Sequence, residues 1–142
     1  MRALYLSMTL LASCATTGAT GGPVIDDRQT AYWVWREGDV WRFRSTAGGK
    51  PHRFQGSIEG LTGGIVEVRT ERSQLRDHVA QVANTVQFDY DADDHSARGF
   101  DVRSTGGCLK VDLMIDGKRR SDAVHYGHKG EAPSRLPTEL CP

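Results

Sequence analysis

Three aspartates in the second half of the chain have the spacing of calcium ligands. Asp89, Asp91 and Asp93 occupy alternate positions, like the first ligands of a calcium-binding loop. Asp94 stands where such a loop needs a glycine for its sharp turn, and Phe100 stands where it needs a bidentate glutamate. Alternate aspartates are also typical of the solvent-facing side of a strand. We therefore expect an exposed strand face that runs into a hairpin loop, and no calcium site.

Histidines are the other candidate metal ligands. His125 and His128 lie three residues apart, and His95 or an aspartate would have to supply a third ligand. Two histidines at this spacing do not share one face of a strand, and the sequence contains no HExxH motif. We expect surface histidines, and neither a metal nor another cofactor. A metal-binding module is the alternative, which titration with calcium or zinc would test.

Three tryptophans could bind a ligand by stacking. Trp33 and Trp35 alternate in one run of the sequence, and Trp41 lies in the next run. Indole rings with a free face can stack on sugar rings, so an exposed stripe of these residues would bind a glycan. The same residues also suit the core of a β-sandwich, and periodicity does not show which face is buried. We expect a core role, with glycan stacking as the alternative.

Catalytic motifs are missing from the sequence. It contains no GxSxG, no glycine-rich phosphate loop followed by lysine, and no CxxC. Its paired carboxylates lie in the acidic loop at residues 89–101 (DYDADDHSARGFD), where we do not expect the burial that adapts a carboxyl group to acid–base catalysis. We expect a non-catalytic protein. A small hydrolase, with active-site residues scattered along the chain, is the alternative.

The elements that would position these side chains are β-strands. Short apolar runs alternate with turns throughout residues 31–142, and the chain contains 16 glycines. We expect an all-β domain of about seven to nine antiparallel strands, built as a β-sandwich or a partly open barrel. Residues 71–84 fit either a helical turn or an irregular strand. Asp116 and Gly117 form a good turn dipeptide between strands.

The first strands are predicted to form a meander. A hairpin around Gly38 would place Trp33 opposite Phe43 and Trp35 opposite Trp41. The next two apolar runs would continue the same sheet, and the ring of Trp41 would then cover a glycine of the following strand. Further along, the sequence STGG predicts a second hairpin between two neighbouring runs.

The N-terminus has the features of an export signal. Arg2 supplies a positive charge, and the apolar run ALYLSMTLL at residues 3–11 is far shorter than the roughly 20 residues that span a bilayer. The sequence LASC follows at residues 11–14. It resembles the signal of bacterial lipoproteins, which has leucine, two small residues and then the invariant cysteine. All four positions match, and the resemblance covers residues 1–14 only.

The resemblance implies that Cys14 is the lipidated first residue of the mature protein. Residues 1–13 would be a cleaved signal peptide, and the acyl chains would hold the protein on the membrane, at about 0.8 kcal/mol per buried CH₂. Ala15, rather than aspartate, follows the cysteine and favours the outer membrane. An ordinary secretory leader with an incidental cysteine is the alternative.

A flexible tether is predicted between the anchor and the domain. Residues 15–30 (ATTGATGGPVIDDRQT) are small, rich in glycine and without an apolar period. We therefore divide the chain into a signal peptide at 1–13, a tether at 14–30 and a single β domain at 31–142. A coil of this length spans roughly 20 Å.

The chain has three cysteines, so lipidation of Cys14 leaves Cys108 and Cys141 as a pair. An exported protein folds in an oxidising compartment, where a disulfide is expected. Closing this loop is worth about 3–4 kcal/mol in the chain-entropy model. Free thiols available for metal or redox chemistry are the alternative, although the two residues are not in a CxxC and no third soft ligand lies at regular spacing.

The charge composition excludes one class of partner. The chain has 18 basic and 18 acidic residues and no net charge, so no basic excess attracts nucleic acid. Together the observations predict a lipid-anchored protein of the cell envelope, placed at the outer membrane. Its domain would have a non-catalytic binding or structural role. The expected partners are the membrane, through the acyl anchor, and an envelope protein or glycan.

Overall fold

Alternating apolar and polar residues build the strands of residues 22–142, the part of the chain that the computed structural model describes. Thr85–Ala92 shows the pattern, because every second side chain from Val86 onward is buried. The elements in chain order are β1 (Ala31–Glu37), β2 (Val40–Thr46), β3 (His52–Gly60), β4 (Ile65–Thr70), η1 (Ser73–His78), β5 (Val79–Val82), β6 (Thr85–Ala92), β7 (Arg98–Ser104), β8 (Leu109–Ile115), η2 (Ser121–Ala123), β9 (Val124–Tyr126), β10 (Ser134–Arg135) and β11 (Glu139–Leu140).

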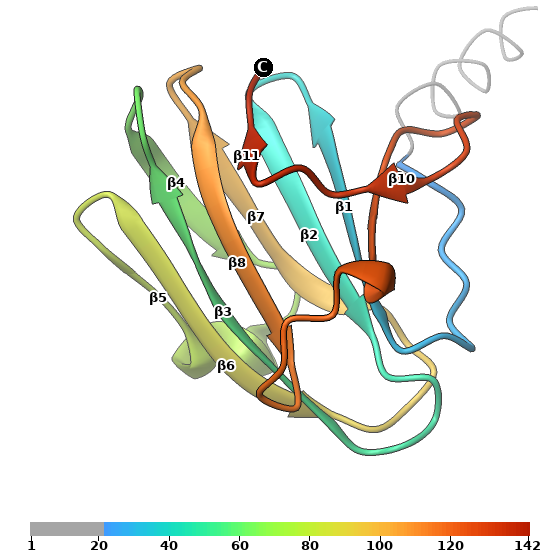
Figure 1. The fold of residues 1–142 in the computed structure, drawn as a ribbon. Coiled ribbons are helices and arrows are strands. Elements are labelled where there is room, and N and C mark those ends of the chain that lie inside the picture. Colours follow the sequence, from blue (N-terminus) through green and yellow to red (C-terminus); the bar gives the residue numbers. More distant parts are fainter. Residues whose placement is uncertain (1–21) are drawn as a thin grey trace, which may run out of the picture.

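The strands form two sheets that pack face to face as a β-sandwich (Figure 1). The six-stranded sheet has the order β10-β9-β1-β2-β7-β4, and the five-stranded sheet has the order β11-β8-β3-β6-β5. The predicted all-β sandwich is therefore confirmed. The described residues contain 11 strands, more than expected, because the C-terminal tail adds the two-residue strands β10 and β11. The pair of β1 and β9 is parallel, whereas the other pairs are antiparallel.

Aromatic rings from both sheets fill the space between the layers. Phe88 of the five-stranded sheet lies 5.0 Å from Phe100 of the six-stranded sheet, measured between ring centroids. Tyr32 and Phe54 make a similar contact at 5.4 Å. The Tyr32 hydroxyl donates a hydrogen bond to the carbonyl oxygen of Met114 at 2.8 Å, so its polar end is satisfied inside the sandwich.

The predicted register of the first hairpin is wrong by one residue. A two-residue turn joins the strands, so Val34 rather than Trp33 pairs with Phe43. A shift of one residue moves every side chain of a strand to the other face of the sheet. Trp33 and Trp35 therefore lie on the outer face of the six-stranded sheet, whereas Trp41 lies in the core.

The predicted meander is also wrong, because consecutive strands belong to different sheets. Strand β2 pairs with β7, and β3 pairs with β6 and β8. The predicted hairpin at residues 104–107 instead connects β7 in one sheet with β8 in the other. Gly56 of β3 is covered by an aromatic ring as expected, but the ring is that of its neighbour Phe88 and not that of Trp41. Alternation shows which face of a strand is buried, but several strands share the same alternation and are interchangeable as neighbours.

Two local predictions are confirmed. Asp116 and Gly117 form a tight turn, with φ values of 53° and 79°, which brings Lys118 beside Ile115. Cys108 and Cys141 form a disulfide that fastens β11 to the start of β8. The ambiguous stretch at 71–84 contains both candidate structures, a 3-10 helix (η1) followed by the short strand β5.

The segment 22–30 packs on the domain, although the sequence assigned it to the tether. Pro23 is buried, and Ile25 packs against the cluster that contains Trp33 and Trp35. The backbone carbonyl of Gln29 accepts a hydrogen bond from the Thr46 hydroxyl at 2.7 Å. The predicted signal peptide, Cys14 and residues 15–21 lie outside the described residues. Residues 22–142 include no helix that is both long enough and apolar enough to cross a membrane.

Candidate binding groove at an open sheet edge

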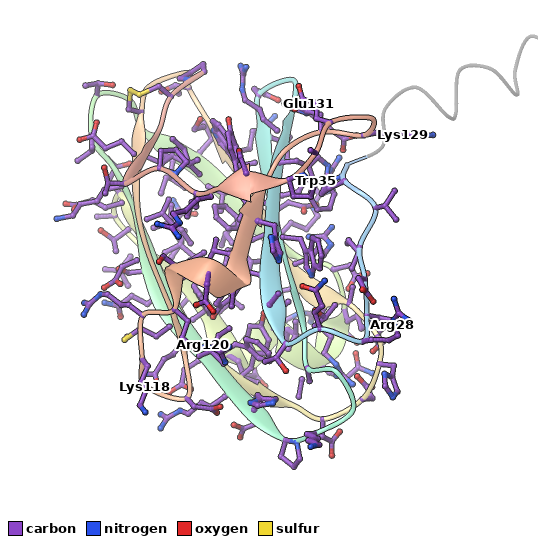
Figure 2. All side chains as sticks on the ribbon, turned by 45° about the vertical axis from the view of Figure 1, so that its right-hand side comes forward. Arg28, Trp35, Lys118, Arg120, Lys129 and Glu131 are labelled. Atoms are coloured by element: carbon purple, nitrogen blue, oxygen red, sulfur yellow. A yellow bond between two sulfur atoms is a disulfide. The ribbon has the colours of Figure 1, made fainter. Side chains whose placement is uncertain are left out.

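The three candidate stacking residues are covered in the structure. Trp33, Trp35 and Trp41 are only 2%, 7% and 1% exposed. The backbone of Gly22 lies directly on the Trp35 ring, near the point where the described chain begins (Figure 2). The Trp33 ring packs on His125, with 4.5 Å between centroids. None of the three rings presents a free face on which a sugar could stack.

The acidic loop is arranged as separate ion pairs. Asp89 accepts two hydrogen bonds from the Arg53 guanidinium, at 2.8 and 2.5 Å. Asp94 pairs with Arg98, and hydrogen bonds from Arg98 and Ser96 lower the pKa of the Asp94 carboxyl to about 2. Of the three aspartates with calcium-ligand spacing, Asp89 is thus held by an arginine of this chain, and the neighbouring Asp94, which is not one of the three, is held by another.

Within residues 22–142, one group of three side chains has potential metal-ligand atoms close to one another. Cys108, Glu139 and Cys141 place one ligand atom each within 4.8 Å of one another, but both sulfurs belong to the disulfide. The histidines make unrelated contacts: His95 approaches the carbonyl oxygen of Asp27 at 3.4 Å, and His125 approaches the Gln29 side chain at 3.2 Å.

The outer face of the five-stranded sheet has a wide depression of about 600 Å³. Amide, hydroxyl and carboxylate side chains line it, among them Gln55, Ser57, Gln87, Asp89 and Asp112. The ion pairs of Arg53 with Asp89 and of Arg119 with Asp112 already use both carboxylates. This depression offers hydrogen bonds over about half of its surface, and the rest is apolar because Ala80, Phe88 and Met114 also border it.

A second depression lies at the edge of the sandwich, between β8, β9 and the segment that crosses from β10 to β11. We call it the edge groove; its volume is about 320 Å³. Figure 1 shows the crossing segment passing from one sheet to the other, in front of the space between β8 and β1. Most of the surface of the edge groove is apolar, and its lining residues are Val111, Asp112, Leu113, Arg119, Arg120, Ser121, Val124, Leu136, Pro137 and Thr138.

The turn after β8 folds a basic loop along this groove. Beyond the turn, the Arg119 guanidinium donates two hydrogen bonds to Asp112, at 2.7 and 2.9 Å, which holds the loop beside the strand. Lys118 and Arg120 are exposed on the same loop, which leads from β8 into η2 (Figure 2). The Arg120 guanidinium makes no hydrogen bond or ion pair with any residue in the described part of the chain, whereas its backbone carbonyl accepts a hydrogen bond from the Ala123 N–H at 2.9 Å. Its charge contributes to the lowered pKa of Asp116, which is caused mainly by hydrogen bonds from Arg53 and His52.

The backbone of β8 has one side on β3 and the other on the groove. The carbonyl oxygen of Cys108 accepts a hydrogen bond from Leu61 at 2.8 Å, on the side of β3. The N–H of Ile115 donates to the carbonyl oxygen of Lys118 at 2.9 Å, on the side away from β3. Successive residues of an antiparallel strand direct their backbone groups to opposite sides. The odd-numbered residues of β8 therefore face away from β3.

Two of the odd-numbered residues of β8 have no strand beside them within residues 22–142. Leu109 pairs with Leu140 of β11, and Ile115 is bridged to the turn. Val111 and Leu113 lie between these two points and direct their N–H and C=O groups into the edge groove. The structure thus combines an unpaired strand edge with an apolar lining.

Sequence reasoning did not find this groove. Strand β11 is short because the chain comes from β10, which pairs with β9 in the other sheet, and pairs with β8 only from Glu139 onward. Pro137, in the crossing segment, has no N–H to donate to a ladder. A proline close to the end of the chain, together with the basic triplet at 118–120, was the available signal.

The fold and the groove define a class of protein: a two-sheet β-sandwich fastened by one disulfide, with an open strand edge at β8. Comparison of the chain with protein-family models, with curated proteins and with solved structures finds no match.

Proposed function

We propose that this protein is a non-catalytic binding module of the bacterial cell envelope. It is anchored to the outer membrane through acyl chains on Cys14, and it binds a polypeptide partner in the edge groove. The observation that carries the binding role is the unpaired backbone of Val111 and Leu113 beside an apolar lining. An exposed strand edge of this kind is a template for the main chain of another segment.

The chemistry of the groove favours a polypeptide over the other ligands considered. A glycan would need an exposed ring face, and the three tryptophans are buried. An acyl chain would fill the apolar space but would leave the groove-facing N–H and C=O groups of Val111 and Leu113 without partners. Each such group costs about 1–3 kcal/mol when it is desolvated and unpaired. A peptide main chain supplies partners for all of them.

The anchor is supported by the four matching positions at residues 11–14. Since the segment 22–30 packs on the sandwich, only residues 15–21 remain to link Cys14 with the described domain. A chain of this length reaches at most about 28 Å when fully extended. The binding domain would then work close to the membrane surface, and its partner would be another component of the envelope.

Replacing Cys14 by serine should release the protein from the membrane. We expect the C14S variant to lose incorporation of radiolabelled palmitate and to move to the soluble fraction after cell lysis, because the thiol that receives the diacylglyceryl group is gone. The matched control is Cys141→Ser, which should keep both the label and the membrane location. If the C14S variant continued to sediment with membranes at the level of the unmodified protein, the anchor proposal would be wrong.

The binding role can be tested by crosslinking in intact cells. A photoreactive amino acid at Ser121, in the lining of the groove, should give crosslinks to a polypeptide. The same group at Gln87, in the wide depression on the outer face of the five-stranded sheet, should not. Val111→Pro removes a groove-facing N–H without breaking the ladder to β3, so it should abolish the crosslinks from position 121. Crosslinks that persist in the V111P variant, or that are equally strong from position 87, would contradict the proposal.

A further inference from the structure

We infer that the partner contributes an extended, acidic segment, which adds to β8 as a short edge strand. This inference rests on the proposed binding role of the edge groove. It deepens that role by stating the backbone conformation and the charge of the ligand. Two independent features of the edge groove support this inference: the spacing of the free backbone groups of β8, and the charges of the basic loop at residues 118–120.

The free backbone groups of β8 define the backbone conformation of the ligand. Val111 and Leu113 are two residues apart, which is the spacing at which one strand presents hydrogen-bonding groups to the next. The available edge is closed at one end by β11, on Leu109, and at the other end by the turn that follows Ile115. At about 3.3 Å per residue, this leaves room for only a few paired residues. The ligand is therefore a short extended segment and not a long strand.

The lining also favours alternating side chains on the ligand. The groove has an apolar side, formed by residues such as Val124 and Leu136, and a solvent side with the basic loop. A strand that adds to β8 directs alternate side chains to these two sides. One set should be apolar and face the groove, and the other set should be polar and face the loop.

The charges of the basic loop indicate which polar side chains the ligand should have. The lining contains two guanidinium groups and one carboxylate, and Asp112 is already paired with Arg119. The Arg120 guanidinium has no hydrogen-bonding partner among the described residues, and the exposed Lys118 lies on the same loop. Asp116 is turned toward His52, and its carboxylate accepts a hydrogen bond from that ring at 2.7 Å. The positive charge that is free to meet a ligand favours carboxylates over ammonium groups.

Two synthetic peptides test the inference directly. The acidic probe is acetyl-Thr-Val-Glu-Val-Glu-Thr-amide, and the basic probe has lysine in place of both glutamates. Binding is measured by calorimetry and by the amide chemical shifts of Val111 and Leu113, using the full chain with Cys14→Ser and the disulfide intact. At low salt we expect the acidic peptide to bind about tenfold more tightly than the basic one, and salt should reduce this ratio. The acidic peptide with N-methyl groups at alternate residues should not bind, because it cannot form the ladder.

Charge variants locate the effect in the groove. Arg120→Glu should weaken binding of the acidic peptide about fivefold to tenfold at low salt. Arg76→Glu makes the same charge change in η1, next to the opposite edge of the five-stranded sheet, and should leave the affinity unchanged. Near-ultraviolet circular dichroism of both variants confirms that the aromatic core is intact.

The outcomes separate this inference from the proposed function. Equal binding of the acidic and basic peptides, or equal effects of R120E and R76E, would overturn the acidic ligand. Full binding of the N-methylated peptide would overturn strand addition. Binding of dodecanoate in the groove, without binding of either peptide, would overturn both and indicate a lipid ligand. Groove-specific crosslinks in cells together with no binding of either peptide would overturn the acidic strand but leave the polypeptide-binding function supported.

Discussion

Loss of the disulfide should lower the free energy of unfolding by about 3–4 kcal/mol. The bond between Cys108 and Cys141 joins residues that are 33 positions apart, and without it the unfolded chain regains the conformational freedom of that loop. The double variant Cys108→Ala with Cys141→Ala removes the bond without leaving reactive thiols. Urea unfolding, followed by tryptophan fluorescence, measures the change in stability.

The same change should loosen one wall of the edge groove. Strand β11 pairs with β8 through two residues only, so the disulfide and the buried side chain of Leu140 are its main attachments. Amide exchange at Leu109, which faces β11, should become faster, whereas exchange at Asp112, which faces β3, should not. Adding reductant to the double-alanine variant serves as the control and should change nothing further. A loss of stability below about 1 kcal/mol would show that the loop is held by other contacts.

Gly56→Ala should destabilise the sandwich by about 3 kcal/mol or more, because β3 has no room for a side chain at this position. A Cβ atom on Gly56 would lie 2.0 Å from the carbonyl oxygen of Asp112 and 3.1 Å from the ring of Phe88. The carbonyl belongs to the backbone of β8, so the clash can be relieved only by moving the strand that borders the edge groove. Thermal and urea unfolding measure the effect.

Gly64→Ala is the matched control for this prediction. A Cβ atom on Gly64 would meet its nearest atoms at 3.9 and 4.0 Å, which is ordinary van der Waals contact. We expect this variant to stay within about 0.5 kcal/mol of the unmodified protein. Similar losses in the two variants would mean that the close approach of β3 and β8 does not limit stability.

Local signals in the sequence were sufficient to predict individual strands, a turn and the disulfide. The alternate aspartates predicted a strand with an exposed face, and the structure exposes Asp89 and Asp91 of β6 while it buries Tyr90 and Ala92 between and beside them. The Asp116 and Gly117 dipeptide predicted a turn, because both positions need a positive φ that glycine adopts readily and aspartate tolerates. The pairing of Cys108 with Cys141 followed from the number of cysteines and the expected compartment.

The neighbours of each strand were not available from the same signals. The register predicted for the first hairpin differs by one residue from the observed register. For this reason the prediction placed Trp33 and Trp35 in the core, whereas the structure has them on the outer face of the sheet. The sequence also did not show that β2 would pair with β7, more than 50 residues further along the chain. Strand pairing at such distances depends on how whole sheets pack, and many alternating segments satisfy the same local pattern.

The edge groove also depends on long-range strand pairing, which local signals in the sequence do not show. It exists because the chain crosses from β10 in the other sheet and then pairs with β8 through only two residues of β11, so the position of the groove depends on a long-range arrangement. By itself, the sequence determined that the chain forms strands, which faces of several strands are apolar, and which cysteines join. Only the tertiary structure decided which strands are neighbours, that the tryptophans are covered, and that Val111 and Leu113 face an open groove. The reason is physical: alternation and turn propensity act over a few residues, whereas an unpaired edge is defined by what the rest of the chain leaves uncovered.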